Sequence, residues 1–362
     1  MTINYLNSFV LAAEVINREV APNQPNISEE ANATVRTTVT EFTKITPNQP
    51  NTSEEANATV RTTTVMEFSK TFIYLTQTEQ CLPQNLASSS EIGNPDTCNC
   101  DVIVLSFQSK CQDQNSSHIT YLSGLNTGWG TGRNVLYSAA IARTPGYHYY
   151  IFVDEDVVLT FNEFTPPKIK NQKPFRVVER WLLDYEPVVG VLNYGVHHGA
   201  WWTYGRRQAV CGITEKSLVI PVVWFDGVFN AHHYKSIRYL FPYRVQYEKI
   251  SWWSIHRSLF SAVELIFRGQ ALMFVPVTAG NPTHRSYPKS LANIHIYWRD
   301  YIETIKQEAP AVYRNRSIFE DFKQNLDNYV ANTLTYCMKV TRHQPIVPYA
   351  HFERHALSKS NS

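Results

Sequence analysis

Three consecutive acidic residues, Asp154, Glu155 and Asp156, lie between two apolar segments of the chain. Burying adjacent carboxylates is unfavourable unless a positive charge meets them. Alternate side chains of an extended segment point the same way, so we expect Asp154 and Asp156 on one side and Glu155 on the other. Two carboxylates on one side can hold a divalent cation, and oxygen ligands suit Mg²⁺ or Mn²⁺. The alternative is a solvated acidic loop after an edge strand.

The segments around these acids predict an alternation of strands and helices. Apolar runs typical of buried strands occupy 101–107 and 149–153, and 118–122 is a further candidate. Residues 128–144 begin with glycines and continue with apolar residues at helical spacing. This is an α/β pattern, and in open α/β sheets ligands bind beyond the carboxyl ends of the strands. The acids follow a strand directly, so their position favours a ligand site.

The segments GRNVLYSAAIART and GYHYYIFVDEDVVL resemble the N-terminal half of GT-A-fold glycosyltransferases, the nucleotide-diphospho-sugar transferases. The pattern of that family is a Gly-rich turn, Arg-Asn, an Ala-rich helix and an apolar strand that ends in Asp-x-Asp. The match covers 101–160 well and extends loosely to about residue 290. The resemblance implies an α/β, Rossmann-like fold with a mixed, mostly parallel sheet flanked by helices. It also implies transfer of a sugar from a nucleotide diphosphate, UDP in the first instance, to an acceptor hydroxyl.

The resemblance further implies roles for single residues. Asp154 and Asp156 would bind Mn²⁺ or Mg²⁺ and, through it, the diphosphate of the nucleotide sugar. Arg133 and Asn134 would lie near the diphosphate, and Ser106, after the first strand, near the nucleotide.

Histidines can complete a metal site of this kind. The resemblance implies one late histidine, and His284 fits because it lies in a polar loop after the expected strand that starts near residue 270. An ordinary loop histidine is the alternative. Because adjacent residues of a helix face different ways, we do not expect a joint metal site from His232 and His233.

The resemblance also implies a general base that deprotonates the acceptor, and Asp226 and Glu248 are the first candidates for it. Asp226 follows an expected strand, and a helix N-cap is an equal alternative for it because the residues from Gly227 onward could be helical. Glu248 precedes a predicted helix that is entered through Ser251, and Glu264 further along that helix is the next candidate.

The start of the chain has a different composition. Residues 22–38 recur almost unchanged at 47–63, and both copies are polar and Thr-rich. Six Asn-x-Ser/Thr sequons begin at Asn26, Asn32, Asn51, Asn57, Asn115 and Asn315. We therefore predict a disordered, glycosylated stalk over 1–80, a Cys-rich junction over 81–100, a catalytic domain over 101–345 and a tail over 346–362.

Composition restricts the classes of function. Of 362 residues 43% are apolar and 13% aromatic, which predicts a globular body. A net charge of +2 without a long basic run argues against nucleic acid as a partner, and no apolar run is long enough to span a membrane. The sequons and six cysteines favour disulfides in the secretory lumen, at the Golgi or, alternatively, in a secreted protein.

Several alternatives remain beside the transferase. The same fold could carry a non-catalytic carbohydrate- or nucleotide-sugar-binding protein. A metal-dependent hydrolase would need a His/Asp cluster beside the acids, and an adhesive surface protein would account for the repeats alone. For the transferase the partners are a nucleotide sugar and a glycan or glycoprotein acceptor. The pairs Trp201–Trp202 and Trp252–Trp253 could stack on sugar rings or serve as core.

Overall fold

A computed structural model gives the fold of the chain from Phe68 onward, with gaps. It describes residues 68–88, 91–112, 117–194, 217–222, 225–267, 269–283, 287–288, 290, 293–308, 311–314, 342–343 and 346. Several predicted features lie outside these residues: both repeats, all six sequons, Cys211, Cys337, Trp201–Trp202, His284 and nearly all of the tail.

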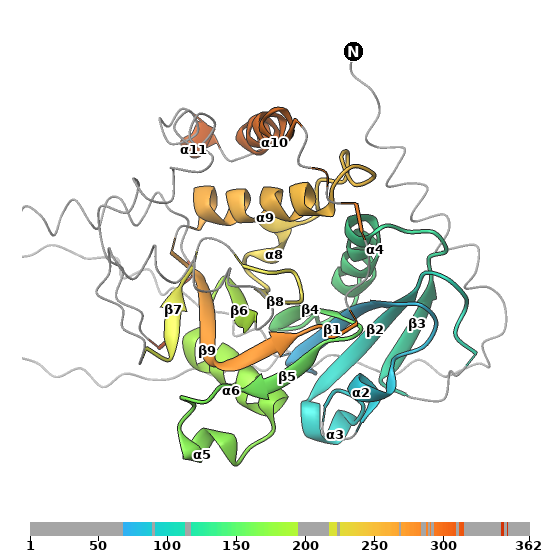
Figure 1. Cartoon of the computed structure of the whole chain (residues 1–362), viewed down its shortest axis with the longest axis vertical. Coiled ribbons are helices and arrows are strands. Elements are labelled where there is room, and N and C mark those ends of the chain that lie inside the picture. Colours follow the sequence, from blue (N-terminus) through green and yellow to red (C-terminus); the bar gives the residue numbers. More distant parts are fainter. Residues whose placement is uncertain are drawn as a thin grey trace, which may run out of the picture. The chain divides into compact units, whose positions relative to one another are not determined.

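The described part of the chain contains one nine-stranded sheet (Figure 1). The strand order is β3-β2-β1-β4-β8-β6-β9-β5, and β7 also pairs with β9. Strands β1, β2, β3, β4, β6 and β9 run in one direction, whereas β5, β7 and β8 run in the other. The sheet is thus mixed and mostly parallel, as predicted. The strands are β1 (Phe72–Thr78), β2 (Cys100–Ser106), β3 (Ile119–Ser123), β4 (Tyr149–Asp154), β5 (Val158–Phe161), β6 (Val189–Tyr194), β7 (Val219–Pro221), β8 (Phe229–His233) and β9 (Ala271–Gly280).

Helices cover both faces of the sheet (Figure 1). One face carries α4 (Trp129–Ile141), α8 (Ile237–Leu240) and α9 (Trp252–Ile266), and α10 (Ile294–Glu308) packs against α9, followed by α11 (Ala311–Arg314). The other face carries α2 (Gln84–Ala87), α3 (Pro95–Cys98), α5 (Pro167–Lys170) and α6 (Pro174–Tyr185). Each face has its own apolar cluster, and burial of these two clusters stabilises the three-layer arrangement.

Strand β1 corrects the predicted boundary of the stalk. It occupies Phe72–Thr78, inside the segment assigned to 1–80, and lies between β2 and β4 near the middle of the sheet. Its sequence FIYLTQT ends in polar residues and follows a Thr-rich repeat, which hides the strand signal. Thr76 and Thr78 are nonetheless buried because both neighbours of β1 are parallel strands covered by helices. The folded body therefore includes residues at least as far back as Phe68.

The Cys-rich segment 81–100 is part of the folded body and not a separate junction. Leu82, Leu86 and Ile92 are buried in the same apolar cluster as α6. Two disulfides, Cys81–Cys111 and Cys98–Cys100, connect this segment to the chain around β2. The prediction of disulfides is confirmed for these four cysteines.

The helix predicted to start after Ser251 is confirmed, since the Ser251 side chain caps α9 by accepting a hydrogen bond from the Ser254 amide. The helical alternative after Gly227 is wrong, because Phe229–His233 forms β8 between β4 and β6. His232 packs edge-on against Phe152 on one face of this strand, and His233 packs against His148.

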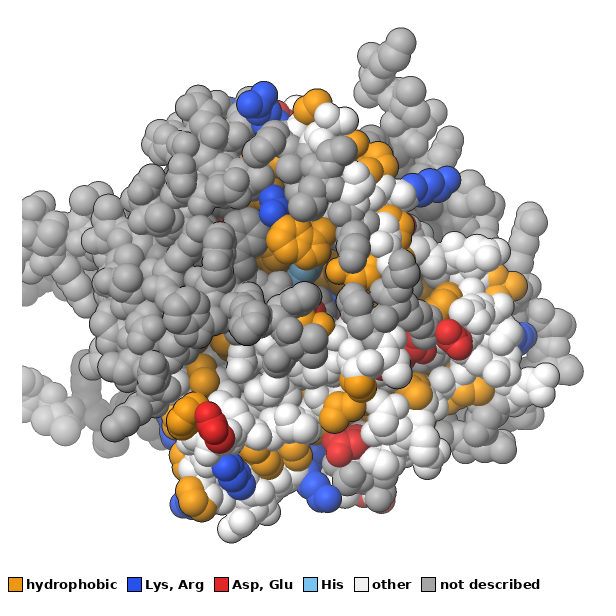
Figure 2. Space-filling model, in the orientation of Figure 1, with side chains coloured by type: hydrophobic (Ala, Val, Ile, Leu, Met, Phe, Trp, Pro, Cys, Tyr) orange, Lys and Arg blue, Asp and Glu red, His pale blue; other side chains and the backbone are white. Residues whose placement is uncertain are grey.

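On the face drawn in Figure 2, lysine and arginine side chains are scattered and do not form one basic patch. None of the helices in the described ranges combines the length and hydrophobicity of a membrane-spanning helix.

Candidate functional site

The candidate site lies where three parallel strands end. Asp154 is the last residue of β4, Tyr194 the last of β6, and Asn281 follows β9 directly. Because β4, β6 and β9 run in the same direction, their carboxyl ends meet at one edge of the sheet. This is the edge at which open α/β sheets bind ligands.

Arg133 of α4 is the cation placed against the first acid. Its Nη2 donates to Asp154 Oδ1 at 2.9 Å and to the carbonyl of Gly227 at 2.7 Å. The guanidinium is buried and lies 4.1 Å from the centre of the Trp129 ring. The Arg133 and Tyr243 side chains also interact, but the buried Arg133 Nη1 and Tyr243 hydroxyl make no hydrogen bond of normal geometry in the described residues. Arg133 is therefore the positive charge that meets Asp154 in this structure.

Asp226 lies beside Asp154, on the turn into β8. The Asp154 amide donates to the Val228 carbonyl at 3.0 Å, and Asp226 Oδ1 accepts from the Val228 amide at 2.9 Å. Burial raises the pKa of Asp154 to about 6; Arg133 opposes this shift, whereas the charges of Asp226 and Asp156 add to it. We call Asp154, Asp156 and Asp226 the acidic cluster.

Asp156 and Glu155 point in different directions, as predicted. Asp156 Oδ2 accepts hydrogen bonds from the Thr283 amide at 3.2 Å and the Thr283 hydroxyl at 2.8 Å. Glu155 accepts instead from the amide of Glu79, at the end of β1, at 3.0 Å. The chain turns after Asp154, with the Val157 amide bonded to the Asp154 carbonyl, and returns as β5. The separation of side chains thus arises from a turn and not from an extended strand.

Two tyrosines adjoin the acidic cluster, and sequence reasoning missed both. Burial raises the pKa of Tyr194 to about 12, and the charges of Asp226 and Asp154 contribute. Burial also raises the pKa of Tyr287, with the same two acids contributing. The Tyr194 hydroxyl donates to Asn281 Oδ1 at 2.5 Å. Both phenols are neutral at pH 7. Because their proximity depends on strand pairing, no local motif signals it.

The acidic cluster offers carboxylate oxygens, which magnesium and manganese ions prefer, although in the described residues the three carboxylates do not lie close enough together to form a ready-made metal site. Three carboxylates face one guanidinium in the described part of the site, so the local charge is negative when all three are ionised. Burial is the main cause of the raised pKa of Asp154, and the negative charges of Asp226 and Asp156 add to it. A hard divalent cation with oxygen ligands would offset this negative charge.

Glu248 is not positioned as a base. Its Oε1 accepts from the amides of Gly130 and, at 3.0 Å, Thr131, and its Oε2 accepts from the Thr131 hydroxyl. These groups form the first turn of α4, so Glu248 caps that helix. Gly128 is required next to it, since a Cβ there would lie 2.4 Å from the Glu248 carboxyl carbon. The alternative, Glu264, is buried within α9.

Ser106 and Asn134 were predicted to lie near the nucleotide sugar. In the structure their side chains bond to backbone groups of the chain itself. Ser106 is buried, and its hydroxyl donates to the carbonyl of Gln80. The Asn134 amide nitrogen donates to the Tyr243 carbonyl at 2.9 Å, and its oxygen accepts from the Tyr243 amide at 2.6 Å. Asn134 thereby ties α4 to the chain that follows α8. Neither residue directs a polar group toward the acidic cluster.

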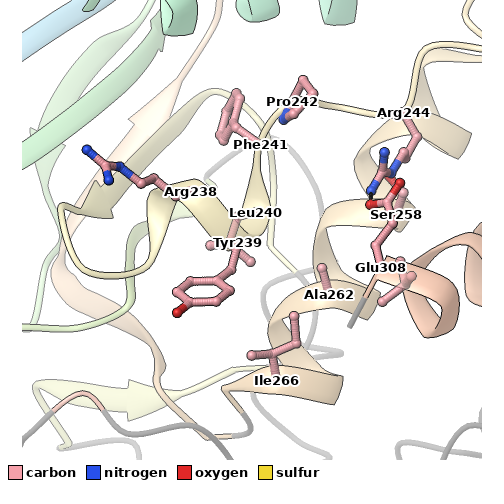
Figure 3. A pocket seen from close by; sticks show the side chains of 11 residues that line it. Arg238, Tyr239, Leu240, Phe241, Pro242, Arg244, Ser258, Ala262, Ile266 and Glu308 are labelled. Atoms are coloured by element: carbon pink, nitrogen blue, oxygen red, sulfur yellow. Dashed lines mark ion pairs between the residues drawn. The ribbon is translucent and has the colours of Figure 1, made fainter. Parts of the chain in front are cut away.

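A separate small pocket of about 150 Å³ lies between α8, α9 and α10 (Figure 3). Arg238 and Tyr239 line one side, and the ion pair between Arg244 and Glu308 lines the other. The lining shares no residue with the acidic cluster. Its volume is below the several hundred Å³ typical of sites for larger ligands, so we do not assign the nucleotide to it.

Comparison with known proteins gives only distant similarities. Neither a protein-family model nor the sequence of a curated protein matches the chain. Among solved structures, glucosyl-3-phosphoglycerate synthase from Mycobacterium tuberculosis in complex with phosphoglyceric acid is 13% identical, with a TM-score of 0.34, over 66% of this chain and 79% of that chain. The same enzyme with Mn²⁺, UDP-glucose and phosphoglyceric acid is 14% identical, with a TM-score of 0.33. A197 from STIV is 11% identical, with a TM-score of 0.32, over 58% of this chain and 84% of that chain.

At these identities and TM-scores the comparisons carry no argument about activity. The structure itself defines the fold: a mixed and mostly parallel α/β sheet with the acidic cluster at the carboxyl edge of its strands.

Proposed function

We propose that the chain is a metal-dependent glycosyltransferase that moves a sugar from a nucleotide diphosphate to an acceptor hydroxyl. One observation carries this proposal: Asp154 is paired with Arg133 at the carboxyl edge of the sheet, and the charges of Asp226 and Asp156 act on it. Carboxylates next to a buried guanidinium suit a ligand that is itself a metal–diphosphate complex. A purely structural ion pair would need one acid and not three.

Each residue of the cluster has a distinct task in this proposal. Asp154 and Asp156 would hold Mn²⁺ or Mg²⁺, with His284 as a further ligand, and Arg133 would bind a phosphate oxygen. The ion supplies charge that stabilises the departing diphosphate. Thr283, the residue before His284, donates two hydrogen bonds to Asp156.

The transfer step forms a bond between the acceptor oxygen and the anomeric carbon, and it breaks the bond from that carbon to the diphosphate. The acceptor hydroxyl must lose its proton in this step. Asp226 is our candidate base because it adjoins Asp154 and Glu248 is engaged in capping α4.

Trp252 is a candidate platform for a sugar ring. It stacks on Tyr287 with ring centres 5.5 Å apart, and the pKa of Tyr287 responds to Asp226 and Asp154. Trp253, its neighbour, is 43% exposed and pairs with Arg257 instead. Only the first residue of this pair therefore adjoins the acidic cluster, where a sugar would be held.

The location proposed for the reaction is the secretory pathway, as a Golgi or secreted protein. Two disulfides support an oxidising compartment. Glycosylation of the sequons, which precede or interrupt the described residues, would agree with it.

The test is a transfer assay on the full chain with a panel of UDP- and GDP-sugars, with Mn²⁺ and with a chelator. The proposal predicts release of nucleotide diphosphate that depends on the ion and increases when an acceptor is added. The alternative, a non-catalytic nucleotide-sugar-binding protein, predicts binding of one panel member without turnover. Binding without turnover across the panel would therefore favour the alternative.

A further inference from the structure

Two histidines and a glutamate meet at the opposite end of β4. His148 precedes β4, His233 is the last residue of β8 and pairs with Tyr149, and Glu186 follows α6. Each offers one ligand atom, and these atoms all lie within 4.8 Å of one another. His148 Nε2 and Glu186 Oε1 are already 3.2 Å apart. Two ligands of a tetrahedral zinc ion are separated by roughly 3.3 Å, given zinc–ligand bonds of about 2.0–2.1 Å.

The His233 ring carries a buried nitrogen without a partner. The residue is 1% exposed, and its Nε2 makes no hydrogen bond in the described residues. Its Nδ1 accepts from the Lys235 amide at 3.2 Å. Burial lowers the pKa of both His148 and His233, so the rings are neutral near pH 7 and each keeps one nitrogen lone pair. A buried polar atom without a partner is unfavourable, and a metal ion would satisfy it.

Glu186 occupies a backbone position that favours glycine. Its φ is +46°, in the left-handed region, where it ends α6 with its amide bonded to the Leu182 carbonyl at 2.9 Å. Helices that end in this way usually have glycine or asparagine there. The strained position brings the carboxylate to His148, which gives a reason for glutamate at this point.

Backbone hydrogen bonds and ring stacking connect the segments that carry the three ligands. The His233 amide bonds to the Val188 carbonyl at 3.1 Å, and the Tyr234 amide to the His148 carbonyl at 3.0 Å. Tyr149 stacks on the His148 ring with centres 5.3 Å apart, and its hydroxyl donates to the Pro187 carbonyl. Only modest changes of side-chain rotamer are needed to bring the three ligand atoms to a common ion.

We propose that His148, Glu186 and His233 form a binding site for Zn²⁺ or a similar divalent transition metal. Two imidazoles and one carboxylate are ligands that such ions accept, whereas Mg²⁺ and Ca²⁺ prefer oxygen alone. His148 and Glu186 are partly exposed, which leaves a fourth position open to water. Asp154 lies six positions after His148, which is roughly 20 Å along an extended chain, so this site is separate from the acidic cluster. The inference does not rest on the proposed function.

Two features of the site oppose the binding of a metal ion. The Lys235 ammonium adds positive charge near both histidines, although its Nζ lies over the Tyr234 ring at 5.6 Å. Binding through Nε2 also requires the proton of His233 to move to Nδ1, which sacrifices the contact with the Lys235 amide. Removing the charge by Lys235→Gln should therefore tighten metal binding.

The experiment measures zinc affinity of the full chain, produced without a histidine tag and stripped with a chelator, by competition with a chromogenic chelator. The background carries Asp154→Asn and Asp156→Asn, so that the acidic cluster does not contribute. We expect one Zn²⁺ per chain, and a loss of affinity of at least ~100-fold in His148→Gln and in Glu186→Gln. His118→Gln is the matched control, because His118 is also buried but lies against the Ile92 carbonyl.

A second measurement keeps the proposal falsifiable if a variant folds poorly. Zn²⁺ should raise the Tm of the unsubstituted chain by several degrees, with little effect on the Glu186→Gln variant. Absence of zinc binding in the background protein would overturn the proposal. Equal affinity in His148→Gln, Glu186→Gln and the control would overturn it as well, because the zinc would then be held elsewhere.

Discussion

Asp156 and Thr283 are 127 residues apart in the chain, yet Asp156 accepts hydrogen bonds from both the amide and the hydroxyl of Thr283. This contact joins the turn after β4 to the loop after β9. The acidic triplet is therefore anchored at both ends of the site: Asp154 to Arg133 and Asp156 to the loop that continues into His284. A ligand bound between the acids would be held by segments from both halves of the sheet.

Replacing Asp156 by alanine should abolish transfer while leaving the fold intact. Asp156 is partly exposed, and the substitution leaves the strands and the Arg133 ion pair in place. We expect turnover to fall by at least about 10²–10³-fold, the scale of losing one group that stabilises developing charge. The assay is nucleotide diphosphate release, with circular dichroism as the check on folding.

Asp96→Asn is the matched control for Asp156→Ala, because Asp96 is an exposed acid in α3. It should retain the turnover of the unsubstituted chain. An Asp156→Ala protein with undiminished turnover would remove the proposed mechanism.

Asp226→Asn separates the role of a base from that of a binding group. Asparagine can still accept a hydrogen bond from the amide of Val228, the residue before β8, so we expect the variant to fold. We expect kcat to fall about 10²–10⁴-fold with little change in the KM of the donor. A rise in donor KM with unchanged kcat would instead assign Asp226 to binding.

Glu248→Gln should preserve turnover within a few-fold, because Glu248 caps α4 and does not face the acceptor. Glu248→Ala should lower the free energy of unfolding by about 1–2 kcal/mol, since amides of Gly130 and Thr131 lose their acceptor. Denaturant unfolding measures this effect. A Glu248→Gln protein that is folded but inactive would restore Glu248 as the candidate base.

The raised pKa of Asp154 predicts how stability depends on pH in the absence of metal. The pKa is about 6 in the folded chain and 3.8 for an unperturbed group, so the folded state binds the proton more tightly. Protonation of Asp154 therefore contributes to the free energy of unfolding. This contribution is fully present below about pH 4 and is lost as pH rises to about 6. With a side chain 28% exposed, we expect a loss on the order of 2 kcal/mol.

Unfolding in denaturant between pH 4 and pH 7.5, with a chelator present, measures this dependence. Asp154→Asn should show a flatter profile over the same interval, since asparagine does not titrate. Saturating Mn²⁺ should stabilise the chain most above pH 6, where Asp154 is ionised. Identical profiles for the two proteins would mean that Asp154 titrates normally.

Local patterns predicted the elements that carry the acids. The apolar run 149–153 ends at Asp154 as β4, and Ser251 starts α9, because burial and capping leave clear signals over a few residues. Strand β1 escaped prediction because its buried threonines look like a continuation of the polar repeat. Strand β8 was not predicted because its histidines and Asn230 are polar. Such residues are buried here because helices cover both faces of the sheet.

The remaining parts of the site depend on contacts between distant segments. Glu248 was predicted as a base from its place before a helix, but it meets the first turn of α4, more than one hundred residues earlier in the chain. Tyr194 reaches Asn281 only because β6 and β9 are parallel neighbours. Sequence patterns report local periodicity, and these pairings arise from the order of strands in the sheet.

The central claim is tested most directly by titration calorimetry of the full chain with UDP and with GDP, each with and without Mn²⁺. The full chain is needed because a fragment starting at residue 80 would lack β1. The account predicts that one nucleotide binds only when Mn²⁺ is present, and that Asp154→Ala abolishes this binding. Equal binding without metal, or no binding of either nucleotide by folded protein, would contradict it.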